Sequence, residues 1–328
     1  MATTFLRRAG AALAAAAVII VAGCSGAGTR ESPGDYPSQD MDWTIAFGPG
    51  GGNDIMARTI VDILQRHQLY PHDIVVENRE GGSGATGWGH LLGEAGSGYS
   101  ISTTSGSFIT TPLQADTGWQ PQDFTPVGLF ATDDALFLVP GAGPVTDWAS
   151  WVQHAKGKGT VVVGGIGTVN VDFIVQAMLA DQAGYEIEYV PFNDEGQMQT
   201  AMLSGSLEAI ISNPGTVLGQ IQAGQLRALL TTAAEPLPEI PDVPTDESLG
   251  FSGLPSMPRG LILPPDAPPH AQQWWIATMQ RVVETPEWQE YIRSNHLSQD
   301  LRWGPDFTTF LDRTQADFRR ILTEQGAL

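Results

Sequence analysis

The sequence predicts an α/β fold in which mainly parallel sheets are covered by helices on both faces. Segments with strand-like and helix-like apolar patterns alternate along most of the chain, as in repeated βαβ units. Two glycine-rich loops, at 48–54 and 164–168, each stand between a strand and a helix. Roughly 290 residues follow residue 40, which is enough for two ordinary domains or one large one.

The N-terminal residues have the pattern of a secretory signal peptide. Arg7 and Arg8 form a short positive region, and the apolar stretch 9–22 follows directly. This stretch is shorter than the about 20 apolar residues that a membrane span needs, and it fits the apolar region of a signal peptide. We therefore expect residues 1–23 to direct export, by the general secretory route because the arginines lack the flanking residues of a twin-arginine signal.

Cys24 is the only cysteine in the sequence, so no intrachain disulfide is possible. Val21, Ala22 and Gly23 precede it and complete a pattern that resembles a bacterial lipobox, whose cysteine receives a diacylglyceryl group before cleavage. The alternative is a signal peptide followed by an incidental free cysteine. We expect lipidation of Cys24, with the Ser-, Gly-, Pro- and charge-rich segment 24–40 as a flexible tether anchored to the membrane.

The charge of the chain is strongly acidic. Asp and Glu number 36 against 16 Lys and Arg, and Lys156 and Lys158 are the only lysines. Nucleic acids and anionic lipids require basic patches on their partners, so this balance argues against both classes of partner. It also means that an anionic ligand would be repelled by the bulk of the protein, so local hydrogen-bond donors must hold it.

The first predicted element of the globular part is a short strand at 43–47. A loop of glycines and one proline follows at 48–52, and Asn53 or Asp54 is expected to cap the next helix. Apolar residues recur at helical spacing from Met56 onward, which supports that helix.

The same alternation continues along the chain. Further strands are expected at 74–76, 99–103, 160–163, 187–190 and 207–211. Further helices are expected at 85–94, 145–155, 171–183, 196–204 and 215–223. The apolar run 124–139 is either two strands or one strand that changes lobes. A proline-rich segment at 236–258 precedes closing helices at 271–284, 287–294 and 307–325.

The two glycine loops are candidate anion sites. Glycines let backbone N–H groups converge, and the N-terminus of the following helix adds partial positive charge. Such a site needs no lysine, and Thr168 and Asn170 can add side-chain donors at the second loop. The alternative is that each loop is only a tight turn. Taken together, the pair suggests one anion pocket shared between two lobes.

Several motifs resemble those of the tripartite tricarboxylate transporter receptors, also called Bug proteins. They occur in the family's order from about residue 41 to the C-terminus, so the resemblance covers nearly the whole mature chain. The motifs are the run 47–54 (FGPGGGND) with Arg58, then 76–84 (VENREGGSG), 123–127 (DFTPV), 190–193 (VPFN), 224–229 (GQLRAL) and 242–245 (DVPT).

This resemblance implies a two-lobed α/β fold of the type II periplasmic-binding-protein class, with a ligand cleft between the lobes. One lobe is expected to comprise residues 41–137 and 256–328, and the other to comprise 138–255. Family members hold a carboxylate in the cleft, largely through backbone N–H groups and water. The ligand-binding residues that the loops and the resemblance indicate are Phe47, Gly50, Gly51, Gly52, Asn53, Asp54, Ser105, Ser107, Gly165, Gly167, Thr168, Asn170, Phe192, Asn193 and Asn213.

The sequence also departs from the family pattern near the second loop. The family often has a histidine where this chain has Val171 and Asp172, and its usual Lys-Gly is replaced by Asn193 and Asp194. Acidic residues here, including Glu195, disfavour a highly charged tricarboxylate. We therefore expect a mono- or dicarboxylate, with an amine or an aromatic part as an option.

Other motifs favour simpler explanations. The run 82–87 matches the G-x-G-x-x-G pattern of dinucleotide sites, but no acidic residue follows at the expected distance, so close helix–strand packing explains it better. The six histidines are scattered, which argues against a metal site. Ser105 has no nucleophile-elbow motif around it. Arg58 is expected to form a structural salt bridge in preference to a ligand contact.

The predicted function is capture of a small organic carboxylate and its delivery to the membrane permease of a tripartite tricarboxylate-type transporter. We expect an exported, membrane-anchored monomer without cofactor or metal and without enzymatic activity. A receptor for a membrane sensor kinase is the alternative within the binding class. An exported α/β hydrolase is the alternative outside it, but the sequence offers no nucleophile paired with a base.

Overall fold

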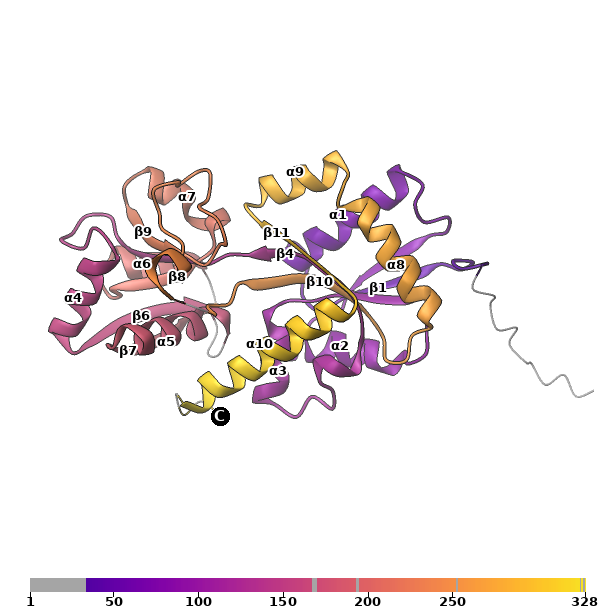
Figure 1. Ribbon diagram of the computed structural model, residues 1–328, viewed down its shortest axis with the longest axis horizontal. Coiled ribbons are helices and arrows are strands. Elements are labelled where there is room, and N and C mark those ends of the chain that lie inside the picture. Colours follow the sequence, from indigo (N-terminus) through magenta and orange to yellow (C-terminus); the bar gives the residue numbers. More distant parts are fainter. Residues whose placement is uncertain (1–33, 167–169, 193–194, 252, 325, 327) are drawn as a thin grey trace, which may run out of the picture. The chain divides into compact units, whose positions relative to one another are not determined.

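The computed structural model describes residues 34–328 except 167–169, 193–194, 252, 325 and 327 (Figure 1). Residues Pro33–Leu328 form one compact unit. The expected signal peptide, Cys24 and most of the tether lie outside the described residues. None of the described helices is both long and apolar enough to cross a membrane.

The first sheet has six strands in the order β11-β4-β10-β3-β1-β2. Its strands are β1 (Met41–Ile45), β2 (Ile74–Asn78), β3 (Ser100–Thr103), β4 (Thr125–Asp133), β10 (Met257–Leu263) and β11 (Ser298–Trp303). The helices connected to them are α1 (Gly52–Arg66), α2 (Ala85–Gly93), α3 (Gly106–Gln114), α8 (Pro269–Val282), α9 (Pro286–Ser294) and α10 (Pro305–Glu324), with short 3₁₀ turns η1 (Gly82–Gly84) and η2 (Pro121–Asp123).

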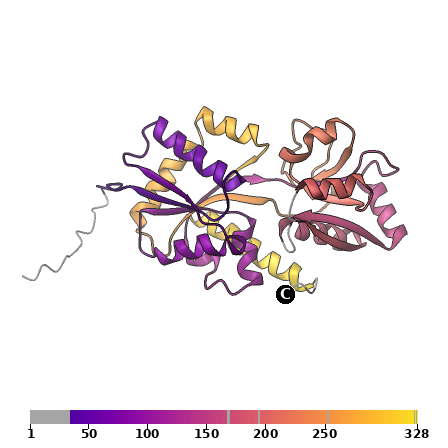
Figure 2. The ribbon, with the colours of Figure 1, turned by 180° about the vertical axis from the view of Figure 1, so that it is seen from behind.

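The second sheet has five strands in the order β7-β6-β8-β5-β9. Its strands are β5 (Leu136–Pro140), β6 (Thr160–Ile166), β7 (Glu186–Phe192), β8 (Ala209–Ser212) and β9 (Leu226–Thr231). The helices between them are α4 (Trp148–Lys158), α5 (Val171–Ala183), α6 (Glu195–Leu203) and α7 (Pro214–Gln222), and a 3₁₀ turn, η3 (Glu247–Leu249), follows. Figure 2 shows the two groups of elements from behind.

The chain passes between the two sheets twice. It leaves the first sheet after β4 through Asp134 and Ala135, and it returns before β10. Because β10 pairs antiparallel with β4 and with β3, the two crossing segments are joined side by side. The expected boundary at 137/138 falls inside β5, all of whose residues pair with β9.

Both sheets are mixed, so the expectation of mainly parallel sheets was wrong. β1, β2 and β3 are parallel, as are β6, β7 and β8, but β10 and β11 are antiparallel to β4, and β5 is antiparallel to its neighbours. For β10 the difference arises at the crossing, because a chain that leaves one sheet and later returns beside the same strand runs in the opposite direction.

Four elements were not predicted, namely helix α3 and the strands β9, β10 and β11. The strands β10 and β11 contain Pro258 and charged residues, which weaken the apolar pattern of a strand. Helix α3 contains Pro112 and several threonines, which lower helix propensity. Burial outweighs the weak local preference in α3 and β10, whereas β11, whose residues are all half-buried or exposed, is held by its antiparallel pairing with β4.

The glycines of the 82–87 motif serve packing. A Cβ atom at Gly84 would lie 2.2 Å from the ring of Trp88, and one at Gly87 would lie 2.5 Å from Cα of Ala46. Gly84 also has φ of +92°, a conformation that favours glycine. Close approach of α2 to β1 therefore explains this motif, as the sequence indicated.

Candidate functional site

The first glycine loop leads from β1 into α1 and leaves backbone donors exposed. Gly51 is the N-cap of α1 and provides no side-chain hydrogen bond, so the expected cap at Asn53 or Asp54 was wrong. Gly50, Gly51 and Gly52 are exposed. The first N–H groups of an α-helix have no acceptor within the helix, so this loop presents them where a ligand can reach.

Asp54 organises the loop from within. The Asp54 side chain is 6% exposed, and its carboxylate accepts hydrogen bonds from the Gly50 N–H at 2.9 Å, from Arg58 at 2.9 Å and from Asn78 at 3.0 Å. Asn78 also donates to the carbonyl of Phe47 at 2.9 Å. The expected ion pair of Arg58 is thus present, and Asp54 holds the loop from inside.

These contacts set the charge state of Asp54. Burial, the largest single influence, raises the pKa of Asp54. The hydrogen bonds from its three partners, together with the positive charge of Arg58, outweigh burial, and the pKa lies below the ordinary value of 3.8. The first loop is therefore built around a stable, compensated carboxylate.

Arg259 of β10 lies behind the same loop, and the sequence reasoning missed it. Its guanidinium donates to Oδ2 of Asp133 at 2.7 Å and lies 3.5 Å from Oδ1 of Asn53, which is buried. A Cβ atom at Gly52 would lie 2.5 Å from Nη2 of Arg259, so only glycine fits there without displacing the guanidinium. The available signal was an arginine within an apolar run, Pro258 to Leu263.

Ser105 and Ser107 lie at the start of α3. Ser105 is the N-cap, is 5% exposed, and its Oγ has no hydrogen-bond partner among the described residues. Ser107 is half-buried in the first turn. A Cβ atom at Gly106 would lie 2.8 Å from Cγ2 of Val171, so the N-terminus of α3 meets the N-terminus of α5 from the second lobe.

The second predicted glycine loop, 164–168, is in part a strand: Gly164, Gly165 and Ile166 end β6 and pair with β7, so the expected loop was wrong for these residues. Gly165 is buried, and a Cβ atom there would lie 2.6 Å from Oη of Tyr189 and 2.7 Å from Cβ of Asp172. Gly167 and Thr168 lie outside the described residues. Asn170 is the N-cap of α5, and its side-chain oxygen accepts from the N–H groups of Asp172 at 3.0 Å and Phe173 at 3.4 Å.

Asp172 is buried beside this loop. Its Oδ2 accepts a hydrogen bond from the Ile166 N–H at 2.8 Å. Burial raises the pKa of Asp172 to about 7, and the negative charges of Glu195 and Asp133 add to the rise, while the bond from Ile166 opposes it. The influence of Asp133 shows that the second loop and the Arg259 region share one electrostatic environment.

The remaining expected residues lie near the ends of β7 and β8. Phe192 ends β7, is half-buried and packs near Gly164, whereas Asn193 lies outside the described residues. Asn213 is the N-cap of α7, and its side-chain amide donates to the carbonyl of Asp134 at 3.0 Å. Asn213 thereby joins the second lobe to the crossing segment between β4 and β5.

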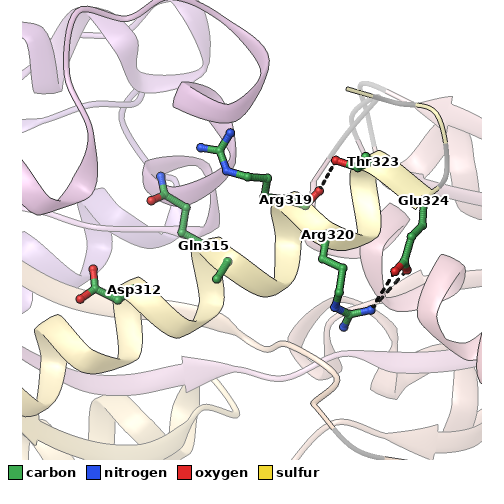
Figure 3. Close-up of a pocket in the computed structure, with 7 residues that line it drawn as sticks. Asp312, Gln315, Arg319, Arg320, Thr323 and Glu324 are labelled. Carbon is green, nitrogen blue, oxygen red and sulfur yellow. Dashed lines mark hydrogen bonds and ion pairs between the residues drawn. The ribbon is translucent and has the colours of Figure 1, made fainter.

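A surface hollow of about 520 Å³ lies elsewhere, along α10 (Figure 3). It is lined by residues of that helix alone, among them Arg320, which pairs with Glu324. No residue of either glycine loop contributes to it. Within the described ranges no group of three or more His, Cys, Asp or Glu side chains is placed to hold a metal ion.

Comparisons with known proteins agree on one family. A family model described as tripartite tricarboxylate transporter family receptor matches residues 56–326. A protein of Cupriavidus necator, described as a UPF0065 protein in the gbd 5' region, is 23% identical over 324 residues, which are 98% of this chain and 97% of that protein. BugT of Bordetella pertussis is 24% identical over 238 residues, 70% of this chain and 72% of BugT.

Solved structures confirm the two-lobed fold class. A TctC solute-binding protein from Polaromonas matches with a TM-score of 0.80 at 22% identity, covering 88% of this chain and 99% of that one. A Rhodopseudomonas palustris protein with adipate matches with a TM-score of 0.72 at 20% identity, covering 89% and 99%. MatC from the same species, with bound malate, matches with a TM-score of 0.66 at 19% identity, covering 87% and 98%.

Proposed function

The chain belongs to the tripartite tricarboxylate transporter receptor family, and from that premise we propose that it captures a small organic carboxylate and delivers it to a membrane transporter of the corresponding type. The observation that carries this proposal is the meeting of helix N-termini from both lobes. The exposed first turn of α1 and the first turn of α3 belong to one lobe, and α5 begins against α3 from the other. Adipate and malate in two proteins of similar fold support a carboxylate ligand.

The proposed mechanism is ligand-driven closure of the two lobes. A carboxylate that accepts hydrogen bonds from both lobes is bound more tightly when the lobes are closed than when they are open. Binding therefore shifts the equilibrium towards the closed form, with the crossing segments beside β4 and β10 as the hinge. The permease would recognise that closed form.

Export and anchoring complete the proposal. Residues 1–23 would be removed as a signal peptide, and a diacylglyceryl group on Cys24 would hold the mature receptor at the membrane. The remaining tether would keep the binding lobes close to the permease. Radiolabelled palmitate incorporated into the wild-type protein, and absent from a Cys24→Ser variant, would support this part of the proposal. Equal labelling of both proteins would contradict it.

Thermal unfolding against a panel of carboxylates tests the binding function. The protein from residue 25 onward is unfolded alone and with mono-, di- and tricarboxylates of increasing length. A ligand present at about 100 times its dissociation constant stabilises the folded state by about 2.7 kcal/mol, which raises the melting temperature measurably. If no carboxylate raises the melting temperature of folded protein that is free of co-purified ligand, the proposed function is wrong.

A further inference from the structure

Arg259 is a buried cation aimed at the first turn of α1. The residue is 8% exposed, donates to Asp133 at 2.7 Å, and packs so closely on Gly52 that a Cβ atom there would lie 2.5 Å away. Its Nε is buried and has no hydrogen-bond partner within the described part of the chain. A guanidinium that is both buried and incompletely paired is costly, so the site has a reason to accept further negative charge.

Arg259 lies against the N-terminus of α1. The N-terminus of a helix carries partial positive charge, and here the guanidinium lies against that end of α1. Asp133 balances the formal charge of Arg259, as Arg58 balances that of Asp54. On this side of the site an added carboxylate therefore meets paired acids and the partial positive charge of the α1 N-terminus.

The other side of the site, at the starts of α5 and α6, carries carboxylates without a cationic partner in the part of the chain that the structure describes. Asp172 is buried and accepts a hydrogen bond from the Ile166 N–H, and Glu195 accepts from Ser212, Thr216 and Gln199. All of these donors are neutral. Among the described residues, no Lys, Arg or His forms an ion pair with either carboxylate, so their negative charge is not compensated there.

We infer that the site is charge-asymmetric. The ligand places one carboxylate at the start of α1, in the field of Arg259, and its far end, next to Asp172 and Glu195, is uncharged or carries a protonated amine. A second carboxylate at the far end is disfavoured, because two like charges brought together in a partly buried site repel strongly. This inference rests on the proposed function and names the substrate class of the same site. In it, Arg259 is a positioning residue that sets ligand charge.

Matched ligands test the asymmetry. At chain lengths of four, five and six carbons, the dicarboxylate, its half-amide, the corresponding ω-amino acid and the diamide are titrated calorimetrically into the protein from residue 25 onward, at pH 8. We expect the best half-amide or ω-amino acid to bind at least about tenfold tighter than the dicarboxylate of the same length. The diamide, which lacks the carboxylate, is expected not to bind.

The outcomes separate this inference from the proposed function. A dicarboxylate that binds as tightly as its half-amide at every length overturns the inference and leaves the carboxylate receptor intact. Failure of every carboxylate at every length contradicts the proposed function and the inference together. If the diamide binds as tightly as the half-amide, no carboxylate is needed at the start of α1, and the inference is wrong.

Variants assign the effect to residues. Arg259→Gln is expected to weaken half-amide binding by about a hundredfold, and Arg259→Lys to restore part of it, since charge is what the position supplies. Asp172→Asn keeps the acceptor for Ile166, and it is expected to improve dicarboxylate binding about tenfold while changing half-amide binding by less than about threefold. Equal changes for both ligands in Asp172→Asn would overturn the inference, even if Arg259→Gln does not fold.

Discussion

The two glycine loops are built by the same device and end in opposite electrostatic states. Each precedes a helix with an aspartate in its first turn, and that carboxylate accepts a hydrogen bond from a backbone N–H: Asp54 from Gly50 in the first loop and Asp172 from Ile166 at the end of β6. Asp54 is also paired with Arg58, and its pKa is lowered. Asp172 has no such cation among the described residues, and burial raises its pKa to about 7.

This difference shows that the local motif determines the backbone, whereas the surroundings determine the charge. Both carboxylates tie a loop to the helix behind it, so either loop would be read from sequence as the same kind of anion site. On the asymmetry inferred above, the paired carboxylate of the first loop tolerates a ligand carboxylate, and Asp172, unpaired among the described residues, resists one. The following changes test that comparison, from the largest expected effect to the smallest.

Gly51→Asp should make the first loop as acidic as the second. The new carboxylate would occupy the exposed turn where a ligand anion is expected, and like-charge repulsion should weaken carboxylate binding by more than about a thousandfold. Isothermal titration with the best carboxylate of the panel measures the loss. Gly143→Asp is the matched control, because Gly143 is also exposed, has nothing within 4 Å of a Cβ atom, and lies far from either loop in sequence. Unchanged carboxylate affinity in folded Gly51→Asp would show that the ligand does not bind at the first loop.

Asp172→Asn should remove a pH-dependent loss of stability. The folded-state pKa of Asp172 is raised from the ordinary value of 3.8 to about 7. Its contribution is therefore fully present below pH 3.8 and is lost as the pH rises to about 7. The unfolding free energy of Asp172→Asn relative to wild type should rise by about 4 kcal/mol across that range, because each pH unit between the two pKa values is worth about 1.4 kcal/mol.

Urea unfolding at half-unit pH steps from 4 to 8 measures this difference. Asp181→Asn is the control, since Asp181 lies on the same helix but is exposed. A difference between Asp172→Asn and wild type that stays constant with pH would show that Asp172 is ordinary in its titration.

Asp54→Asn should lower the unfolding free energy at neutral pH, which is opposite in sign to the change in Asp172→Asn. It removes the charged partner of Arg58 and weakens the hold on Gly50, and we expect a loss of about 2 kcal/mol in unfolding free energy at pH 7. Because the folded-state pKa of Asp54 is lowered, its contribution is present above the ordinary value of 3.8 and is lost as the pH falls. The variant and the wild type should therefore converge in acid, as followed by the same urea titrations.

Arg58→Gln should have the smallest effect. The Arg58 side chain is 50% exposed, so water screens its ion pair with Asp54. We expect a loss of about 0.5 kcal/mol, near the usual value for exposed pairs. Carboxylate affinity should stay within about threefold of wild type if Arg58 is structural. A loss as large as that of Gly51→Asp would instead place Arg58 in contact with the ligand.

Much of the fold was predictable because the deciding signals are local. Helix α5 runs from Val171 to Ala183, the range that was predicted for it. The first loop stands where glycines interrupt a strand and a helix. Helix α3 and strand β10 were missed because Pro112 and Arg259 contradict the local pattern, and long-range packing decides their structure.

The site was only partly predictable for the same reason. Gly51, Gly52 and Asn170 were proposed from loop chemistry as ligand residues, and the structure shows Gly51 as the cap of α1 and Asn170 as the cap of α5. Nothing near Arg259 in sequence places it on Gly52, some 200 positions away.

By itself, the sequence determined the α/β class, the order of most elements, the family motifs and the position of the first glycine loop. It also indicated the Arg58 ion pair, which lies within one helix. The tertiary structure added the distant partners and decided which carboxylates are buried. Asn78 reaches Asp54 across 24 positions and Arg259 reaches Asp133 across 126. Backbone propensities act over a few residues, whereas burial and ion pairing depend on what the fold brings together.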